Sequence, residues 1–392
     1  MDGHMNSTAP RILLVASVPG HFRAFHLPWV RRLRELGCEV HGAADRITEM
    51  PECVDAFDEV HDIPFSRSPL DVRAAAVAGR TIARLIDRAE YDLVHVHTPV
   101  AAFTTRRYAH PSRARGTAMV YTAHGFHFHR SGGPVMNFIF RTVEKRAGRW
   151  TDYLVVINQD DEIAARELNI VPPEKIWYIP GVGIDLEEFS PGRISVHDVQ
   201  RIRDELSLTP DDKLVTMVAE LIPRKRHHDV IRAVALLNRS DIHVAFVGDG
   251  ARRAEIEGLV AAHGLDESVH FLGYRRDVPA LLRAATCAVL VSEFEGLPRS
   301  VMEALCLEVP VVGSDARGIR DLLADGGGII VPIGDTKRLA GAIGEFVDNP
   351  VHSREVGAAG RRHMSRYSLP QVIALNERLY ACALGVRFSS CL

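Results

Sequence analysis

The sequence predicts an α/β protein made of two doubly wound domains. Short apolar segments typical of buried parallel strands alternate with amphipathic helical segments, and this alternation runs twice along the 392 residues. A segment rich in turn-forming residues, 180–191, separates the two runs. A chain of this length also exceeds one ordinary hydrophobic core, so two domains are expected.

The composition excludes several classes of protein. Hydrophobic residues make up 46% and charged residues 25%, the balance of a soluble globular protein. The net charge of -3 gives no overall field that would attract nucleic acid. Six scattered cysteines without a C-x-x-C pair are typical of a reduced, cytoplasmic protein. No apolar run is long enough to span a membrane. Residues 1–9 are expected to be a tag or a disordered N-terminus.

The first domain is expected to begin with a β-α-β unit. A strand at 11–16 leads into a helix from about Phe22 to Leu36, and Gly37 caps that helix before the next strand begins at Glu39. Further elements follow the same alternation: a helix at 70–89, strands at 92–97, 118–122 and 153–158, a helix at 159–168 and a strand at 175–179.

The second domain repeats this organisation after the turn-rich segment. Strands are expected at 213–219, 243–247, 269–274, 287–291, 309–313 and 328–331. Helices are expected at 252–263, from about 298 onward, from 335 to 347, and at 350–366 and 369–384.

The loop 293–297 has the features of an anion site. It follows a buried strand, and Pro298 stands where a first helical residue is common. A helix N-terminus presents unpaired N–H groups and the positive end of the helix dipole, and Gly296 allows close approach to the backbone. Glu295 and Glu303 flank this turn, and carboxylates accept paired hydrogen bonds from sugar hydroxyls. The alternative is an ordinary strand-loop-helix unit with solvated glutamates.

The segment from Glu295 to Glu303, with sequence EGLPRSVME, resembles the signature of the retaining, nucleotide-sugar-dependent glycosyltransferases with the GT-B fold, known as group 1 or family 4. The resemblance extends over nearly the whole chain. It implies two Rossmann-like domains facing each other across a cleft, with residues 10–185 binding the acceptor and 186–366 binding the nucleotide sugar. Residues 367–392 are then expected to form a C-terminal helix that crosses back to the first domain.

The resemblance also implies roles for individual residues. His124 would reach the donor sugar, Lys225 would neutralise the leaving diphosphate, and Glu295 would hold the transferred sugar; these are the three candidate catalytic residues. The donor would be bound by Gly20, Arg224, Lys225, Tyr274, Arg275, Glu295, Gly296, Leu297, Arg299, Ser300 and Glu303. Glu220 stands where most members have Arg. In this feature and at 315–322 the chain resembles a branch associated with exopolysaccharide and cell-surface glycan assembly.

A metal site is the less favoured interpretation of the histidines. His95 with His97, and His127 with His129, form two His-x-His pairs, but no Cys or carboxylate lies at ligand spacing nearby. The chain also lacks an Asp-x-Asp motif. Neither a metal nor a cofactor is therefore expected, and the UDP-sugar is the donor substrate of a metal-independent enzyme.

The predicted reaction is transfer of a sugar of glucose or N-acetylhexosamine type from a UDP-sugar to a hydroxyl acceptor, with retention of configuration, in cell-surface glycan or polysaccharide assembly. One alternative is a small soluble acceptor such as a natural product. A UDP-sugar 2-epimerase and a non-catalytic binder of sugar nucleotides are further alternatives.

The segment 95–150 is locally basic and indicates a peripheral contact with the inner membrane face. It holds nine basic residues against one acidic residue, Glu144, together with the apolar stretch 135–140 and Trp150. Such a surface suits an anionic membrane or an acceptor with a lipid diphosphate. The alternative is a solvated helix face whose apolar side packs into the core. The basic residues are Arg106, Arg107, Arg113, Arg115, Arg130, Arg141, Lys145, Arg146 and Arg149.

Overall fold

The computed structural model describes residues 9–66, 68, 71–129, 132–386 and 388. The expected tag up to Thr8, as well as Arg130 and Cys391, lies outside the described residues. The described chain forms two compact units. The first unit extends to Val182 and resumes at Val372, and the second unit comprises Gly183–Gln371.

The first unit is built on a parallel sheet that has seven strands in the described part of the chain, in the order β3-β2-β1-β4-β5-β6-β7. Its central strands are almost fully buried, because helices cover both faces. The strands are β1 (Arg11–Val15), β2 (Glu39–Ala44), β3 (Glu59–Asp62), β4 (Leu93–Val96), β5 (Ala118–Ala123), β6 (Tyr153–Val156) and β7 (Ile176–Tyr178).

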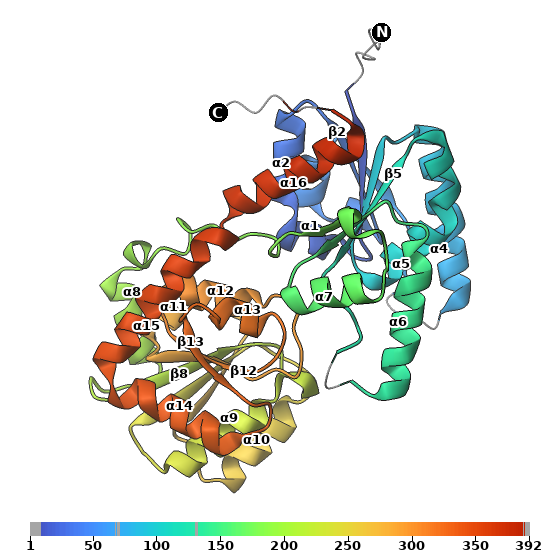
Figure 1. Cartoon of the computed structure of the whole chain (residues 1–392). Coiled ribbons are helices and arrows are strands. Elements are labelled where there is room, and N and C mark those ends of the chain that lie inside the picture. The colour runs from blue at the N-terminus through green and yellow to red at the C-terminus, as the bar shows by residue number, and fades with distance from the viewer. Residues whose placement is uncertain (1–8, 67, 69–70, 130–131, 387, 389–392) are drawn as a thin grey trace. The chain divides into compact units, whose positions relative to one another are not determined.

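Helices from both ends of the chain cover this sheet. Helix α16 (Leu369–Leu384) lies beside α2 in Figure 1, and the Arg32 guanidinium donates to the Glu377 carboxylate at 2.6 Å. Tyr380 of α16 is fully buried and packs edge-on against Trp29. The other helices are α1 (Pro19–Phe25), α2 (Leu27–Glu35), α3 (Pro51–Ala56), α4 (Val72–Ala89), α5 (Pro99–Ala109), α6 (Pro134–Gly148) and α7 (Gln159–Glu167).

The second unit contains a parallel sheet with six strands among the described residues, ordered β10-β9-β8-β11-β12-β13. The strands are β8 (Lys213–Val218), β9 (Ile242–Val247), β10 (Val269–Gly273), β11 (Cys287–Leu290), β12 (Val311–Ser314) and β13 (Gly328–Val331). The helices around it are α8 (Val196–Glu205), α9 (His227–Leu237), α10 (Arg253–Ala262), α11 (Val278–Ala284), α12 (Arg299–Cys306), α13 (Ile319–Leu323), α14 (Thr336–Asp348) and α15 (Pro350–His363).

Both sheets are doubly wound, which confirms the predicted fold class. The strand order runs outward in one direction from β1 and in the other from β4; β8 and β11 form the same junction in the second unit. Loops that follow the strands on either side of such a junction diverge, so ligands of open α/β sheets bind there, beyond the carboxyl ends of the strands.

Several expected elements differ from the structure. The single helix predicted at 22–36 is wrong: α1 and α2 are separate helices that meet at His26. Pro28 lies in the first turn of α2, where the absence of its N–H is tolerated, whereas inside one continuous helix the proline would remove a hydrogen bond. Pro298 is the residue preceding α12 rather than its first helical residue. In the described ranges, no helix is both long and apolar enough to cross a bilayer.

Candidate functional site

In the second unit, most of the predicted donor residues lie near the junction between β8 and β11. These two strands are direct neighbours in the sheet. The loop after β8 contains a short 3-10 turn, Pro223–Lys225, and the loop after β11 runs to Pro298 before α12. A backbone hydrogen bond from the Glu293 N–H to the Arg224 carbonyl, 2.9 Å long, joins the two loops.

Glu295 is the centre of this site. Its side chain is buried, and its Oε1 accepts hydrogen bonds from Lys225 Nζ at 2.5 Å and from Arg224 at 3.1 Å. The Arg224 guanidinium also donates to the Phe294 carbonyl at 3.2 Å. Two cations therefore share one carboxylate, and the group retains one positive charge.

Burial shifts the pKa of Lys225, one of the two cations that bind Glu295. Loss of water around Lys225 lowers the pKa of its ammonium group, and the adjacent Glu295 carboxylate opposes that change. Its side chain keeps about 12% of its surface exposed, so it remains reachable by a ligand. An ammonium with so little hydration has little water to lose when it contacts an anion.

Glu303 lies one turn into α12 and is paired within its own helix. The Arg299 guanidinium donates to its Oε1 at 2.8 Å, and the Glu303 side chain is only 13% exposed. Burial raises the pKa of the Glu303 carboxyl, and Arg299 opposes the rise. Glu303 and Arg299, both predicted to bind the donor, thus contact each other in the structure.

The loop after β12 contacts the backbone of residues 295 and 296. The buried Arg317 guanidinium donates to the Glu295 carbonyl at 3.1 Å. Gly318 has a φ of +75°, and a Cβ at this position would lie 2.1 Å from the Gly296 carbonyl oxygen. Only glycine allows this approach. The segment 315–322 resembles one branch of the family in sequence, but neither Arg317 nor Gly318 was predicted to be a site residue.

A second ion network fixes the loop after β8. Arg226 has a left-handed backbone conformation and binds the Asp229 carboxylate at 2.6 Å and Glu293 at 3.1 Å. Its charge is therefore neutralised inside the protein. Glu293 was not predicted as a site residue, because its role depends on a contact between two distant loops.

The remaining predicted donor residues are placed as follows. Leu297 and Ser300 flank the start of α12 and are partly exposed, as is Gly296. Tyr274 is 82% exposed after β10. Arg275 binds Asp277 at 2.8 Å and Glu205 at 3.0 Å, so internal carboxylates hold its guanidinium. Glu220 is exposed at the end of β8.

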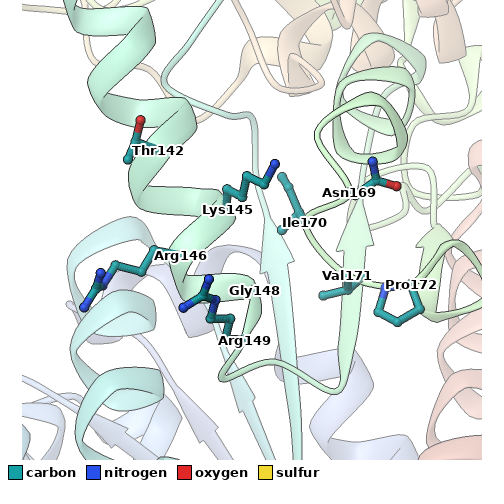
Figure 2. A pocket seen from close by; sticks show the side chains of 9 residues that line it. All are labelled: Thr142, Lys145, Arg146, Gly148, Arg149, Asn169, Ile170, Val171 and Pro172. Carbon is teal, nitrogen blue, oxygen red and sulfur yellow. The ribbon is translucent and has the colours of Figure 1, made fainter.

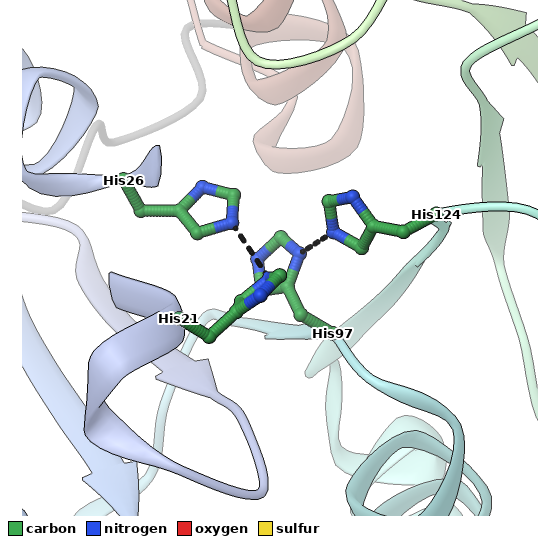
Figure 3. Close-up of side chains that lie close together, drawn as sticks. All are labelled: His21, His26, His97 and His124. Atoms are coloured by element: carbon green, nitrogen blue, oxygen red, sulfur yellow. Dashed lines mark hydrogen bonds between the residues drawn. The ribbon is translucent and has the colours of Figure 1, made fainter. Parts of the chain in front are cut away.

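The first unit has its own polar cluster at the equivalent junction between β1 and β4. His21 lies in α1, His26 lies between α1 and α2, His97 follows β4, and His124 follows β5. Figure 3 shows the four rings turned toward one another, with two hydrogen-bonded pairs. The predicted Gly20 lies beside them in the first turn of α1, where a Cβ would meet no atom within 4 Å.

Burial keeps these rings neutral. It lowers the pKa of His21 to about 4 and holds the pKa of His26, His97 and His124 well below the usual value; the neighbouring histidines add to this effect for the last three. His124, the predicted catalytic residue of this unit, is thus part of a neutral imidazole cluster.

The predicted His-x-His pairs do not act as pairs. The His95 nitrogens contact the Tyr380 hydroxyl and the Thr122 hydroxyl, each at 2.7 Å, which leaves no lone pair for a metal ion. His97 instead joins His21, His26 and His124. His127 is exposed and contacts the Phe140 ring. Sequence spacing could not reveal this grouping, because the four residues follow three different strands.

Comparison with known proteins identifies the family. Residues 198–363 match the model of "Glycosyl transferases group 1", and residues 29–188 match that of "Glycosyltransferase Family 4". The chain belongs to the group 1 glycosyltransferases. A relative from Bacillus subtilis, the putative glycosyltransferase EpsD, is 35% identical over 380 residues, which cover 96% of this chain and 97% of the relative.

Other relatives and solved structures agree with this assignment. An Escherichia coli UDP-Gal:alpha-D-GlcNAc-diphosphoundecaprenol alpha-1,3-galactosyltransferase is 28% identical over 69% of this glycosyltransferase and 70% of its own length. The crystal structure of Anabaena HepE in complex with UDP has a TM-score of 0.78 at 19% identity and covers 96% of this chain and all of HepE. This similarity of structure confirms the GT-B fold.

The close contact at Gly318 yields a first prediction. Gly318→Ala should destabilise the second unit of the glycosyltransferase by at least about 1–2 kcal/mol, since Ala adopts positive φ only at that cost and its Cβ collides with the Gly296 carbonyl. Displacement of that loop should also weaken sugar-nucleotide binding. Chemical denaturation and calorimetry measure the two effects.

Gly341→Ala is the matched control, because a Cβ at Gly341 in α14 meets no atom within 4 Å. This control should be neutral or stabilising by about 0.5–1 kcal/mol. Equal stability and donor affinity for Gly318→Ala and the wild type would contradict the proposed loop contact.

Proposed function

We propose that this glycosyltransferase transfers a sugar from a UDP-sugar to a hydroxyl of a lipid-linked acceptor during cell-surface polysaccharide assembly, with retention of configuration. The observation that carries the proposal is the Arg224–Lys225–Glu295 group at the sheet junction, directly before the N-terminus of α12. It combines a net positive charge for a diphosphate with a carboxylate for sugar hydroxyls.

The charges at the site suggest a division of roles. Lys225, Arg299 and the backbone amides of Gly296 and Leu297 stabilise the departing diphosphate. Such groups act most strongly where water is excluded and need no reorganisation during the reaction. Binding of the anion draws Lys225 away from Glu295, so that the Glu295 carboxylate accepts hydroxyls of the transferred sugar.

Other residues hold the rest of the donor. Glu303 accepts the ribose hydroxyls, and the backbone at Tyr274 and Arg275 contacts the base while the Arg275 side chain remains bound to Glu205 and Asp277. His124 in the first unit directs a neutral imidazole at the donor sugar. Two similar proteins support uridine as the nucleoside: the E. coli relative is named as a UDP-Gal-dependent galactosyltransferase, and HepE was crystallised with UDP.

A lipid-linked acceptor is supported by the surface of α6. Its apolar residues Val135, Met136, Phe138 and Ile139 are between 44% and 71% exposed, so they do not pack into the core as the alternative interpretation required. Exposed apolar residues in a row mark contact with a membrane or another protein. The name of the E. coli relative specifies a diphosphoundecaprenol acceptor.

Six of the basic residues near α6 form two groups. Arg106, Arg113 and Arg115 bind Glu144, Asp152 and Asp87, so their charges are used inside the unit. Lys145, Arg146 and Arg149 instead line a pocket of about 650 Å³ between the end of α6 and residues 169–172 (Figure 2). Three cations around one pocket suit an anionic lipid head group.

Glu303→Ala should mainly weaken donor binding, by roughly 1.5 to 3 kcal/mol, the typical value of a hydrogen bond to a charged group. The ribose contact exists in both the ground and the transition state, so kcat should change little. Calorimetric titration with UDP-sugars measures the loss. Glu345→Ala, in helix α14 of the same unit, is the control and should bind normally. Unchanged affinity in the Glu303 variant would exclude a ribose contact.

Lys225→Ala should lower kcat by about 10²- to 10³-fold, because negative charge develops on the leaving diphosphate in the transition state. Donor binding should be affected less, because other groups of the site also bind the donor. Single-turnover kinetics at saturating donor provide the measurement. An unchanged rate would assign the diphosphate to Arg224 or Arg299.

Incubation of the wild type with the donor alone distinguishes a transferase from an epimerase. Slow release of UDP indicates a transferase, whereas formation of a 2-epimer of the donor would identify an epimerase instead.

The protein should sediment with vesicles that contain anionic lipid at low salt and dissociate at high salt. Replacing Lys145 and Arg149 by Glu should weaken this binding at least roughly 30-fold, since each basic residue near an anionic surface contributes about 1 kcal/mol. Phe138→Ser should weaken it further by removing an exposed apolar anchor.

Arg338→Glu and Val196→Ser are the matched controls. Both residues are highly exposed, but they lie on α14 and α8 of the second unit. They should leave vesicle binding unchanged. Absence of binding by the wild type at low salt, together with efficient glycosylation of a small water-soluble acceptor, would replace the lipid-linked acceptor by a soluble one.

A further inference from the structure

The histidine cluster of the first unit is arranged like a set of metal ligands. One ring nitrogen from each of His21, His26, His97 and His124 lies within 4.8 Å of the corresponding nitrogen of every other member. Two of these separations are shorter: His21 Nε2 to His26 Nε2 is 3.1 Å, and His97 Nδ1 to His124 Nε2 is 3.2 Å (Figure 3).

These separations are close to those around a bound zinc ion. Zinc in proteins is tetrahedral with Zn–N distances of about 2.0–2.1 Å, and this geometry places neighbouring nitrogens about 3.3–3.4 Å apart. The two measured pairs are within about 0.3 Å of that value. The nitrogens of the two pairs lie within 4.8 Å of one another and would move closer together around one ion.

Hydrogen bonding alone leaves the cluster incompletely satisfied. Within the described residues, the Nε2 atom of His97 is buried and has no hydrogen-bond partner, although the residue is only 1% exposed. Buried polar atoms are rarely left without a partner. The ring of His97 lies between those of His26, 4.1 Å away by centroids, and His124, 5.4 Å away.

The four-histidine cluster differs from the neighbouring His95 in the hydrogen bonds that its ring nitrogens make. His95 is packed against His97, with ring centroids 4.2 Å apart, but both of its nitrogens are engaged by Tyr380 and Thr122. Imidazole nitrogens favour zinc, copper, nickel and iron over magnesium or calcium.

We propose that His21, His26, His97 and His124 bind one zinc ion in a tetrahedral site at the junction of β1 and β4. The ion links the turn after β1, the bend between α1 and α2, and the loops after β4 and β5. It is a structural ion and takes no part in holding the donor diphosphate, which side chains of the second unit neutralise.

The proposal goes beyond the proposed function and is compatible with it. When Nε2 of a neutral imidazole binds a metal ion, the proton resides on Nδ1. A zinc-bound His124 would therefore present a fixed N–H donor, and its tautomer would no longer fluctuate. The sequence-based expectation of a metal-free protein would then apply to the diphosphate site alone.

Metal binding to the whole chain, in the absence of any nucleotide, tests the proposal. The protein is purified without a metal-affinity step, stripped with a chelator and titrated with Zn²⁺. Elemental analysis should find one zinc per chain. Bound Zn²⁺ should increase the free energy of unfolding by RT ln(1 + [L]/Kd), and the melting temperature should rise accordingly. Substitution by Co²⁺ should give the visible absorption of a tetrahedral cobalt centre.

His21→Ala and His124→Ala, at the two partly exposed positions, should each weaken zinc binding by more than about 100-fold, since loss of even an outer partner of a ligand costs 10- to 100-fold. Their folding is checked by circular dichroism in the zinc-free state. The melting temperature of these variants should not respond to Zn²⁺.

His61→Ala is the control in the same unit, because His41, Glu59 and His61 form the second group of potential ligands among the described residues. It should retain stoichiometric zinc. The proposal is overturned if the wild type binds no zinc or if cobalt gives no tetrahedral spectrum. It is also overturned if His61→Ala loses zinc binding while His21→Ala retains it. Sugar-transfer activity is assayed separately, so failure of the proposed function leaves these readouts intact.

Discussion

The reversal of strand order in each parallel sheet is the constraint on which both candidate sites depend. Right-handed crossover connections place helices on opposite faces of the sheet on either side of β1/β4 and of β8/β11. The loops after these strands diverge and leave the carboxyl edge accessible. Polar side chains can then gather at that edge without disturbing the buried strands beneath them. The histidine cluster occupies one junction, and the Glu295 ion group occupies the other.

The second junction is held by charge and by close backbone packing together. Glu295 is a buried carboxylate, and such a group is tolerated because Lys225 and Arg224 surround it. Its backbone is fixed by Arg317 and by the glycine contact between residues 318 and 296. The candidate site residues are therefore held in place by the protein itself, which is the condition for efficient electrostatic stabilisation of a transition state.

Most of the fold, but only part of the site, could be predicted from the sequence. Continuous apolar runs identify the central strands, whereas the edge strand Glu59–Asp62 is short and polar and gave no such signal. The glutamate signature identified the strand–loop–helix unit formed by β11 and α12, because its residues are contiguous in sequence. The partners of that loop are not contiguous with it: Arg226 binds its Glu293 carboxylate, and Arg317 binds its Glu295 carbonyl. The spacing of His95 and His97 likewise suggested a pair, although hydrogen bonds to Tyr380 and Thr122 separate their roles.

The position of α16 has a consequence for protein synthesis. The first unit contains both ends of the chain, and Tyr380 fills its core and binds His95, 285 residues earlier. A ribosome that adds 5–20 residues per second needs roughly 15 to 60 s to make the intervening chain. The second unit is continuous in sequence and emerges entire within that interval. The nascent first unit must therefore wait with an unfilled core, a period in which a chaperone could protect its exposed apolar surface.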